Sequence, residues 1–385
     1  MISFDTSATV HSAYIHWPFC PYRCHFCPFV ALASHDQFME RYHNALKKEI
    51  RDFAQKCDQK PHLKTIFFGG GTPSTYPDAL LLDTFDTLKS VFSFDEEIEV
   101  TIEVNPGTIR PEQMKIWKDA GINRLSIGVQ SLKDGVLQKM NRHQTAEQVF
   151  FLLEHAEPYF ENLSVDLILG FPDVSDDEWK ELLKKAVTWP IKHISMYFLT
   201  IHENTQLYFK VQQNKVQLPP DNAIVDLYHW SRDFLAQHGF EQYELSNFAH
   251  PGYESKHNTV YWERDPYYAF GLGACSFDGT RRFQNEKNLM KYLAHVEQEK
   301  PIVTFAETLT EQQIRLERMM LGLRRRQGVA RTVLMQGLNA QQCENIALNI
   351  AELKENNFLV EQDDVLRLTP IGLAVENQII TKLSL

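Results

Sequence analysis

The chain has 385 residues, 43% of them hydrophobic, so it is long enough for two domains with packed cores and is not a disordered protein. Its net charge of −11 excludes a protein that coats nucleic acid, because such a protein needs a basic surface. Residues 1–12 form no leader segment, and no stretch reaches the roughly 18 apolar residues of a membrane span. We therefore predict a cytoplasmic protein whose thiols stay reduced.

Up to about residue 200, short apolar runs alternate with helical patterns. The runs that predict strands are 14–17, 65–68, 99–104, 124–128, 163–169 and 193–199. The helical patterns between them cover 38–53, 77–92, 111–120, 145–159 and 175–187. Parallel neighbours need long crossovers, so the alternation predicts an α/β fold with a parallel sheet. Six units are too few for a closed eight-fold barrel and fit a partial (β/α)6 barrel, with a doubly wound sheet as the alternative.

The pattern changes beyond residue 200. The next hundred residues are rich in aromatics and loops, with one helical pattern at 221–237. From residue 311 the sequence predicts two helices and a hairpin that turns at Asp363-Asp364, an order that resembles a small winged-helix domain. The run Arg324-Arg325-Arg326 is predicted to be a solvated helix end. We predict three parts: a partial barrel at 1–205, an extension at 206–305, and an α+β C-terminal unit with a winged-helix-like fold at 306–385.

Three cysteines, Cys20, Cys24 and Cys27, follow the first predicted strand. A structural zinc site needs four ligands, and here only His16 or His25 could complete the set. An iron–sulfur cluster also takes thiolate ligands, and three thiolates on a cubane leave one iron free to bind a small molecule. The other cysteines are isolated and are predicted to be packed, inert thiols: Cys57, Cys275 and Cys343.

Polar or flexible residues stand at the ends of the other predicted strands, where α/β folds bind ligands. The second strand ends in Gly69-Gly-Gly-Thr-Pro73, and glycines allow a ligand to approach the backbone. Glu103 lies on the third strand, where a ribose or an ammonium group would be a suitable partner and a salt bridge to Arg124 or Arg142 is the alternative. The remaining strands supply Gln130, Asp166 and Thr200, and Arg142 follows the fourth.

The C-x3-C-x2-C spacing on this loop resembles the radical S-adenosylmethionine (SAM) superfamily. The resemblance implies a [4Fe–4S] cluster on Cys20, Cys24 and Cys27, a SAM molecule on its free iron, and an electron donor such as a flavodoxin or ferredoxin. Segments such as Tyr14-Ile-His-Trp-Pro-Phe-Cys20 and Val165-Asp-Leu-Ile-Leu-Gly-Phe-Pro172 are similar to the oxygen-independent coproporphyrinogen III oxidase family. Carried over by position, this likeness implies SAM contacts at Tyr14, Phe26, Gly70, Gly71, Thr72, Glu103, Gln130, Arg142, Asp166 and Thr200.

That family has an oxidase branch, which decarboxylates coproporphyrinogen III, and a heme chaperone branch, HemW, which hands heme to target proteins. Three features resemble the chaperone branch. Phe29 stands where the oxidase has a further cysteine, few residues precede Tyr14, and Lys256-His257-Asn258-Thr-Val-Tyr261-Trp262 is similar to a HemW segment. Neutral imidazole is a good iron ligand, so His257 is a candidate to bind heme, with a hydrogen-bonded loop histidine as the alternative. The resemblance implies heme or a porphyrin as the small-molecule partner and an unidentified heme-accepting protein, with the oxidase as the alternative function.

Overall fold

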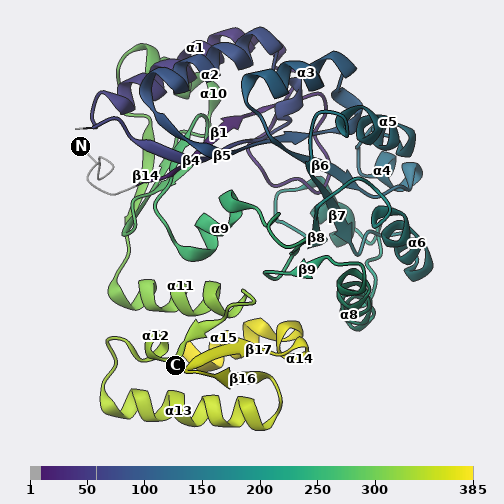
Figure 1. Ribbon diagram of the computed structural model, residues 1–385, viewed down its shortest axis with the longest axis vertical. Helices are drawn as coiled ribbons and strands as arrows, with labels where there is room; N and C mark the ends of the chain where they lie inside the picture. The colour runs from purple at the N-terminus through teal and green to yellow at the C-terminus, as the bar shows by residue number, and fades with distance from the viewer. Residues whose placement is uncertain (1–9, 58, 385) are drawn as a thin grey trace.

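The structure is a computed structural model that describes residues 10–57 and 59–384. Its main feature is a sheet of nine strands in the order β11-β1-β4-β5-β6-β7-β8-β10-β9 (Figure 1). The six strands from β1 to β8 in this order are parallel, and they lie in the order in which they occur along the chain. Their bounds are β1 Ser12–Trp17, β4 His62–Gly70, β5 Ser93–Val104, β6 Arg124–Gln130, β7 Asn162–Leu169 and β8 His193–Phe198.

The strand order decides between the two predicted arrangements. A doubly wound sheet reverses its strand order at a switch point, whereas every crossover between these parallel strands steps in the same direction. A sequential parallel sheet of this kind twists in one sense and encloses a lumen on its inner face. The predicted partial (β/α)6 barrel is therefore confirmed, and each of its six predicted strands is present.

The crossover helices lie on the outer side of the sheet (Figure 1). Five occur where the sequence predicts them: α1 Met39–Ala54, α2 Asp78–Val91, α3 Pro111–Ala120, α5 Ala146–Ala156 and α6 Asp176–Ala186. The sequence pattern does not predict α4 (Asp134–Lys139), because six residues carry little periodic signal. Short 3-10 turns complete the barrel: η1 Asp36–Phe38, η2 Pro73–Thr75 and η3 Pro106–Thr108. None of the described helices combines the length and the apolar character needed to cross a bilayer.

Alternation along the parallel strands separates an apolar outer face from a polar lumen. On β6, Leu125, Ile127 and Val129 are fully buried in the main core, against the helices. The alternate residues Arg124 and Ser126 point to the other face, because successive side chains of a strand alternate. The same alternation on the neighbouring strands lines the lumen with hydroxyl and carboxyl groups, so the inner face can hold a polar ligand.

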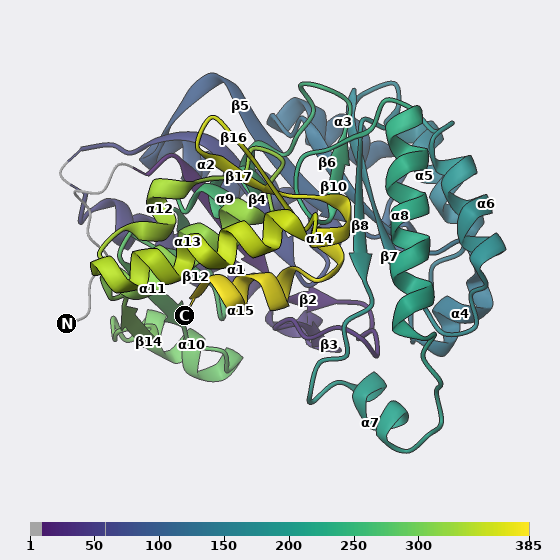
Figure 2. The ribbon, with the colours of Figure 1, turned by 90° about the horizontal axis from the view of Figure 1, so that it is seen from below.

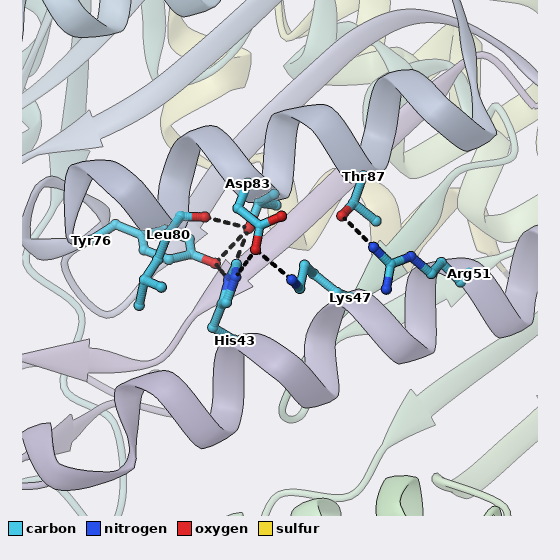
Figure 3. Close-up of polar contacts among 8 residues, drawn as sticks. His43, Lys47, Arg51, Tyr76, Leu80, Asp83 and Thr87 are labelled. Carbon is cyan, nitrogen blue, oxygen red and sulfur yellow. Dashed lines mark hydrogen bonds and ion pairs between the residues drawn. The ribbon is translucent and has the colours of Figure 1, made fainter.

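Helices α1 and α2 are joined by buried polar contacts as well as by apolar packing (Figure 3). The buried His43 on α1 contacts the Tyr76 hydroxyl through Nδ1 at 3.0 Å and the Asp83 carboxylate through Nε2 at 2.9 Å. Lys47 donates to the same carboxylate. Burial lowers the pKa of His43, so its imidazole is neutral at pH 7. These contacts fix how the helices that follow β1 and β4 sit against each other.

Residues 206–305 complete the sheet at both edges. β11 (Tyr268–Phe270) pairs in parallel with β1. At the other edge, β10 (Asn247–Ala249) pairs antiparallel with β8 and, on its outer side, with β9 (Glu241–Gln242). The predicted helix at 221–237 is α8 (Asp221–Gln237). The other elements are β2 Phe19–Cys20 and β3 Leu32–Ala33 in the cysteine loop, then α7 Gln206–Gln212, α9 Lys256–Glu263, β12 Cys275–Phe277, β13 Arg281–Asn285, α10 Leu289–Glu297 and β14 Val303–Thr308.

Residues beyond 310 form a unit with a hydrophobic core of its own at one end of the molecule (Figures 1 and 2). Its elements are α11 Glu311–Leu323, β15 Val329–Ala330, α12 Arg331–Met335, α13 Ala340–Glu355, β16 Leu359–Gln362, β17 Val365–Leu368, α14 Pro370–Ala374 and α15 Glu376–Ser384. Asp363 and Asp364 turn the β16–β17 hairpin with φ angles of 52° and 61°, as a two-residue type I′ turn requires. The predicted α+β make-up of this region is confirmed.

The arginines at the end of α11 form ion pairs. The prediction of a solvated helix end is wrong for Arg324 and Arg325, whose side chains are 22% and 18% exposed, whereas that of Arg326 is 61% exposed. Arg324 forms an ion pair with Glu376 at 2.7 Å, within the C-terminal unit. Arg325 binds Glu263 at the end of α9, also at 2.7 Å, and Arg326 binds Glu241 on β9. Carboxylates that are distant in sequence therefore hold this helix end against the barrel.

A second ion-pair group joins α11 to α9. Glu317 on α11 accepts from Nε of Arg264 at 2.8 Å and lies 2.6 Å from Nη1 of Arg282. The Arg264 side chain is 6% exposed and that of Glu317 is 17% exposed, so this pair is largely shielded from water. The C-terminal unit thus contacts the barrel mainly through the helix that faces the lumen (Figure 1).

Candidate functional site

The three clustered cysteines lie on the loop after β1, at the carboxyl ends of the parallel strands. Cys20 is buried and accepts a hydrogen bond from Thr72 Oγ1 at 3.2 Å. Cys24 accepts one from Nη1 of Arg142 at 3.8 Å. Burial raises the pKa of Cys20 to about 11 and also raises that of Cys27, and the neighbouring thiols add to both shifts. The three thiols are therefore close enough to interact, with a hydroxyl and a guanidinium beside them.

These thiols fit an iron–sulfur cubane better than a single metal ion. Within the described residues, no group of three His, Cys, Asp or Glu side chains is placed to hold one metal ion. His16 contacts the Val30 carbonyl through Nε2 at 2.9 Å and the Tyr14 hydroxyl through Nδ1 at 3.1 Å, and His25 contacts the Lys139 carbonyl through Nδ1 at 3.0 Å. In a cubane each thiolate binds a different iron, so the sulfur atoms lie farther apart than around zinc.

The glycine-rich turn after β4 brings the backbone against the neighbouring strands. Gly70 has a φ of +117°, and its N–H donates to Oε2 of Glu103 at 3.1 Å. A Cβ on Gly70 would lie 2.5 Å from the His16 ring, and one on Gly71 would lie 2.6 Å from the Pro18 backbone. Both positions therefore require glycine, because neighbouring protein atoms occupy the space of a side chain.

Glu103 carries a carboxyl group that the protein keeps largely uncharged. Burial raises its pKa to about 8, the nearby Asp166 adds to the rise, and the Gly70 N–H opposes it. Among the described residues no ion pair joins Glu103 to Arg124 or Arg142, so the salt-bridge alternative is not what the structure shows. A protonated carboxyl can donate to an acceptor on a ligand as well as accept from its hydroxyl groups.

Asp166 is fixed by hydroxyl groups of the flanking strands. Ser126 on β6 donates toward its two carboxylate oxygens at 3.2 and 3.3 Å, and the Ser195 side chain on β8 also hydrogen bonds to it. Burial raises the pKa of Asp166, while these hydroxyls and the positive charges of Arg124 and Arg142 act in the opposite direction. The carboxylate therefore has a defined position in the lumen.

Arg142 connects the cysteine loop to the end of β6. Its Nη2 donates to the Gly128 carbonyl at 2.5 Å, and its Nε donates to Gln144 Oε1 at 2.8 Å, while Nη1 points to Cys24. Two of the three nitrogens of Arg142, a predicted SAM contact, therefore bind protein acceptors. Gln130, the last residue of β6, has a φ of 64°, a backbone conformation that is uncommon for a residue with a side chain.

A cavity of about 240 Å³ opens in the lumen between the parallel strands and α9. All six parallel strands contribute to its wall, and Phe29 comes from the cysteine loop. The lining residues are Tyr14, Phe29, Phe67, Gly70, Glu103, Arg124, Ser126, Asp166, Ser195, Tyr197, His257, Asn258 and Tyr261. The cavity therefore brings together the predicted residues Tyr14, Gly70, Glu103, Asp166 and His257.

The other predicted residues lie outside this lining. Gly71, Thr72 and Arg142 surround the cysteine loop. Phe26 packs edge-on against Phe171, with the ring centroids 5.6 Å apart. Thr200 is exposed, because β8 ends at Phe198 rather than at the predicted residue 199.

His257 is buried at the amino end of α9, and both of its ring nitrogens have partners. Nδ1 lies 2.8 Å from Thr65 Oγ1, and Nε2 lies 2.9 Å from the Tyr261 hydroxyl. The ring also stacks on Phe67 at a centroid distance of 5.0 Å. Burial lowers the pKa of His257 to about 3, and the charge of Arg124 contributes. The imidazole is therefore neutral at pH 7, and it can bind iron through Nε2 only when Tyr261 moves away.

The position of α9 is set by a carboxylate on the sheet. Glu99 on β5 is buried and accepts from the backbone N–H groups of Lys256 at 3.0 Å and His257 at 2.9 Å. Ser255 caps the same helix end by accepting from the Asn258 N–H. A negative charge at a helix amino terminus is favourable, because the free N–H groups and the helix dipole are positive there.

Sequence reasoning missed several residues of the cavity. The sequence suggests Arg124 only as an ion-pair partner and gives no direct sign of Ser195 or Tyr197, although each occupies an inner position of its strand. The period of two along each strand was the signal that could have found them. Cys275, predicted to be a packed thiol, is exposed and accepts from Nε2 of Gln284 at 3.0 Å, so that prediction is wrong.

Known proteins resemble the chain over nearly its whole length. The radical SAM superfamily model matches residues 14–186. A protein of Bacillus subtilis (strain 168) named heme chaperone HemW is 34% identical over 96% of this chain and 97% of its own length. One of Lactococcus lactis with the same name is 31% identical over 97% of each chain.

A solved structure described as coproporphyrinogen III oxidase (HemN) from Escherichia coli superposes with a TM-score of 0.84. It is 23% identical, and the match covers 98% of this chain and 90% of that one, which shows a shared fold. Fold alone does not separate the two branches, but the curated relatives are similar in sequence across both the barrel and the C-terminal unit. The chain therefore belongs to the HemW branch of the radical SAM superfamily.

Proposed function

We propose that the protein is a heme chaperone, which binds heme and passes it to a heme-accepting protein. The observation that carries the proposal is the composition of the lumen cavity. His257 and Tyr261 on α9 face the same space as Tyr14 and Glu103, which lie toward the cysteine loop. The curated relatives that match the chain end to end bear the name of this function.

A radical SAM domain implies a [4Fe–4S] cluster and SAM, and the cluster supplies the electron chemistry of such a site when it is bound. We assign Cys20, Cys24 and Cys27 as its ligands. Thr72 and Arg142 then direct an O–H and an N–H at two of the sulfur atoms, which stabilises thiolate charge. The electron donor is proposed to be a flavodoxin or ferredoxin.

The proposed SAM contacts form a path from the cysteine loop into the lumen. They comprise the cavity residues Tyr14, Gly70, Glu103 and Asp166 and the surrounding residues Phe26, Gly71, Thr72, Gln130, Arg142 and Thr200. Glu103 and Asp166 suit hydroxyl and amino groups, because one is protonated and the other is held by serines. Gly70 and Gly71 let the backbone of this turn pass close to His16 and Pro18, which keeps the turn beside the cysteine loop.

Heme uptake requires α9 to move. The cavity of about 240 Å³ is smaller than the roughly 300–1,000 Å³ of pockets that enclose cofactor-sized ligands. Opening the Tyr261–His257 hydrogen bond frees Nε2 of a neutral imidazole, which is the form that binds iron. We therefore propose His257 as the heme ligand, with release of Tyr261 as the step that exposes it.

The test uses anaerobically reconstituted protein, incubated with hemin in one sample and with coproporphyrinogen III, SAM and a reductant in another. We expect hemin to bind, with a Soret band that changes in the His257→Ala variant and is unchanged in His155→Ala, a variant of a partly exposed histidine on α5. Transfer is measured by mixing the loaded protein with an apo-hemoprotein. Failure to bind hemin, or conversion of coproporphyrinogen III to a decarboxylated product, would overturn the proposal.

A further inference from the structure

Arg124 is a buried cation that has no partner of its own. It is the first residue of β6, its side chain lines the lumen cavity, and it is 1% exposed. Its Nε is buried without a hydrogen-bond partner, and no ion pair joins it to a carboxylate among the described residues. Its charge lowers the pKa of Asp166, but no carboxylate forms an ion pair with it in the described part of the chain. A buried guanidinium without a direct partner is costly, so a group that binds it is expected in the cavity.

The strands on either side of Arg124 carry further unsatisfied polar atoms. Thr101 on β5 and Asn162 on β7 are its partners in the sheet register. Thr101 Oγ1 and Asn162 Oδ1 are both buried without a hydrogen-bond partner, as Nε of Arg124 is. Buried polar atoms in folded proteins are nearly always paired, and three such atoms side by side on adjacent strands indicate a polar group that belongs among them.

The charges around the cavity favour an anion at this place. Arg124 is the one arginine or lysine among the lining residues that the structure describes. Of the lining carboxyl groups, Glu103 is largely protonated at pH 7 and Asp166 is bound by Ser126. His257 is neutral, because burial lowers its pKa to about 3. The positive charge of Arg124 is therefore not cancelled by a neighbour in contact with it.

The site is distinct from the cysteine loop, where the resemblance implies a SAM molecule on the free iron of the cluster. Arg142, a predicted SAM contact, lies at that loop and binds the Gly128 carbonyl. Gly128 follows Arg124 by four residues on β6, so about 13 Å of strand separates the two positions. A ligand carboxylate that reaches Arg124 must therefore come from a second molecule in the lumen.

We propose that Arg124 anchors a carboxylate of the ligand that enters the cavity, namely a propionate of heme. The inference rests on the proposed function and adds how the cargo is recognised. Guanidinium groups bind carboxylates through two parallel N–H donors, and the Thr101 hydroxyl adjacent in register can supply a further donor. Arg124 then orients the porphyrin edge while His257 is positioned for the iron.

The experiment compares hemin with hemin dimethyl ester, in which both propionates are blocked. We expect the protein to bind hemin about tenfold or more tightly than the ester, the range for a hydrogen bond to a charged group. The Arg124→Met variant should bind the two with equal affinity, while Arg124→Lys keeps part of the preference. Arg315→Met, a change at a buried arginine in the C-terminal unit, should keep all of it.

The outcomes separate the inference from the function on which it rests. Equal binding of hemin and ester by the unmodified protein would overturn the inference while leaving the chaperone proposal intact. This comparison does not depend on whether any variant folds. A preference for hemin over the ester that persists in Arg124→Met would also overturn the inference, whether or not that variant loses SAM binding. Absence of any hemin binding by the unmodified protein would overturn the proposed function itself.

Discussion

Glu103 shows how the lumen changes the behaviour of a single side chain. Its carboxyl loses a proton near pH 4.5 under ordinary conditions, but burial first and Asp166 second raise its pKa to about 8 in the folded chain. The folded state therefore holds a proton that the unfolded state has released. Stability falls as pH rises between these two values, because the unfolded state gains the more favourable charged form.

We predict that Glu103→Gln removes this pH dependence. Between pH 6 and pH 8 the ligand-free protein should lose about 2 kcal/mol of unfolding free energy through Glu103, and the variant should not. Urea unfolding of both proteins at the two pH values gives the change in unfolding free energy for each. The contributions of other buried groups, such as Glu49, are the same in both proteins and cancel in the comparison. If the unfolding free energies of the two proteins changed equally with pH, the assignment of a protonated Glu103 in the folded state would be contradicted.

A second prediction at this scale concerns Thr72. Its hydroxyl donates to the Cys20 sulfur at 3.2 Å, and hydrogen bonds to the sulfurs set the reduction potential of an iron–sulfur cluster. Thr72→Val should leave the iron content of reconstituted protein unchanged and lower the potential by up to roughly 40 mV. A redox titration followed by electron paramagnetic resonance measures this, with Thr72→Ser as the control that keeps the hydroxyl. An unchanged reduction potential in the valine variant would show that the hydrogen bond from Thr72 to Cys20 does not influence the cluster.

Single residues differ in how far the sequence predicts them. Cys20, Glu103 and Asp166 can be found because a thiol group or an isolated carboxyl in an apolar run has few structural explanations. Arg124 could not be assigned in this way, since an arginine at the start of a strand is usually a surface residue. Its burial follows from the curvature of the sheet and from α9, which comes from a segment more than a hundred residues later.

At the scale of elements, α9 depends on one carboxylate of the sheet. Glu99 satisfies two backbone N–H groups at the start of the helix; the bond to His257 is buried and the bond to Lys256 is partly buried. We predict that Glu99→Ala destabilises the protein by about 2 kcal/mol or more and raises hydrogen exchange at the α9 amides, because the N–H groups lose their acceptor. Urea unfolding and exchange mass spectrometry measure both effects.

The matched control for Glu99 lies two residues earlier on the same strand. Glu97 is exposed, and within the described residues its carboxylate forms no hydrogen bond or ion pair with α9, although its backbone carbonyl accepts from the Lys256 side chain. Glu97→Ala should change stability by less than about 0.5 kcal/mol. If the two variants behaved alike, the carboxylate of Glu99 would not be what holds α9 in place.

Elements also differ in how well the sequence predicts them. The parallel strands and their helices are long and periodic, so their positions agree closely with the prediction. β10 and β11 contain three residues each and were not predicted, because such short runs have no measurable period. Their place in the sheet depends on pairing with β8 and β1, which no local pattern encodes.

For the whole molecule, the contact between barrel and C-terminal unit centres on Glu317. It binds the nearly buried Arg264 at the end of α9 and also Arg282. We predict that Glu317→Gln costs roughly 3 kcal/mol of unfolding free energy, because it leaves a buried arginine without its counter-charge. Urea unfolding checks this value, and limited proteolysis between β14 and α11 reports whether the unit loosens.

An exposed pair provides the comparison for Glu317. Lys115 and Asp119 form an ion pair one helical turn apart on α3, with both side chains more than 60% exposed. Asp119→Asn should change stability by less than about 1 kcal/mol, since exposed ion pairs contribute little. If Glu317→Gln lost as little unfolding free energy as Asp119→Asn, the two units would be held together by apolar packing instead.

The pairing of β11 with β1 also has a consequence for biosynthesis. Ala13 lies opposite Tyr268, so the strand that precedes the cysteine loop lacks its outer neighbour until the ribosome has made 268 − 13 = 255 further residues. Contacts so distant in sequence form late, and unpaired strand edges attract other chains in the meantime. The edge of β1 beside the cysteine loop therefore gains its outer neighbour only after most of the chain has been translated.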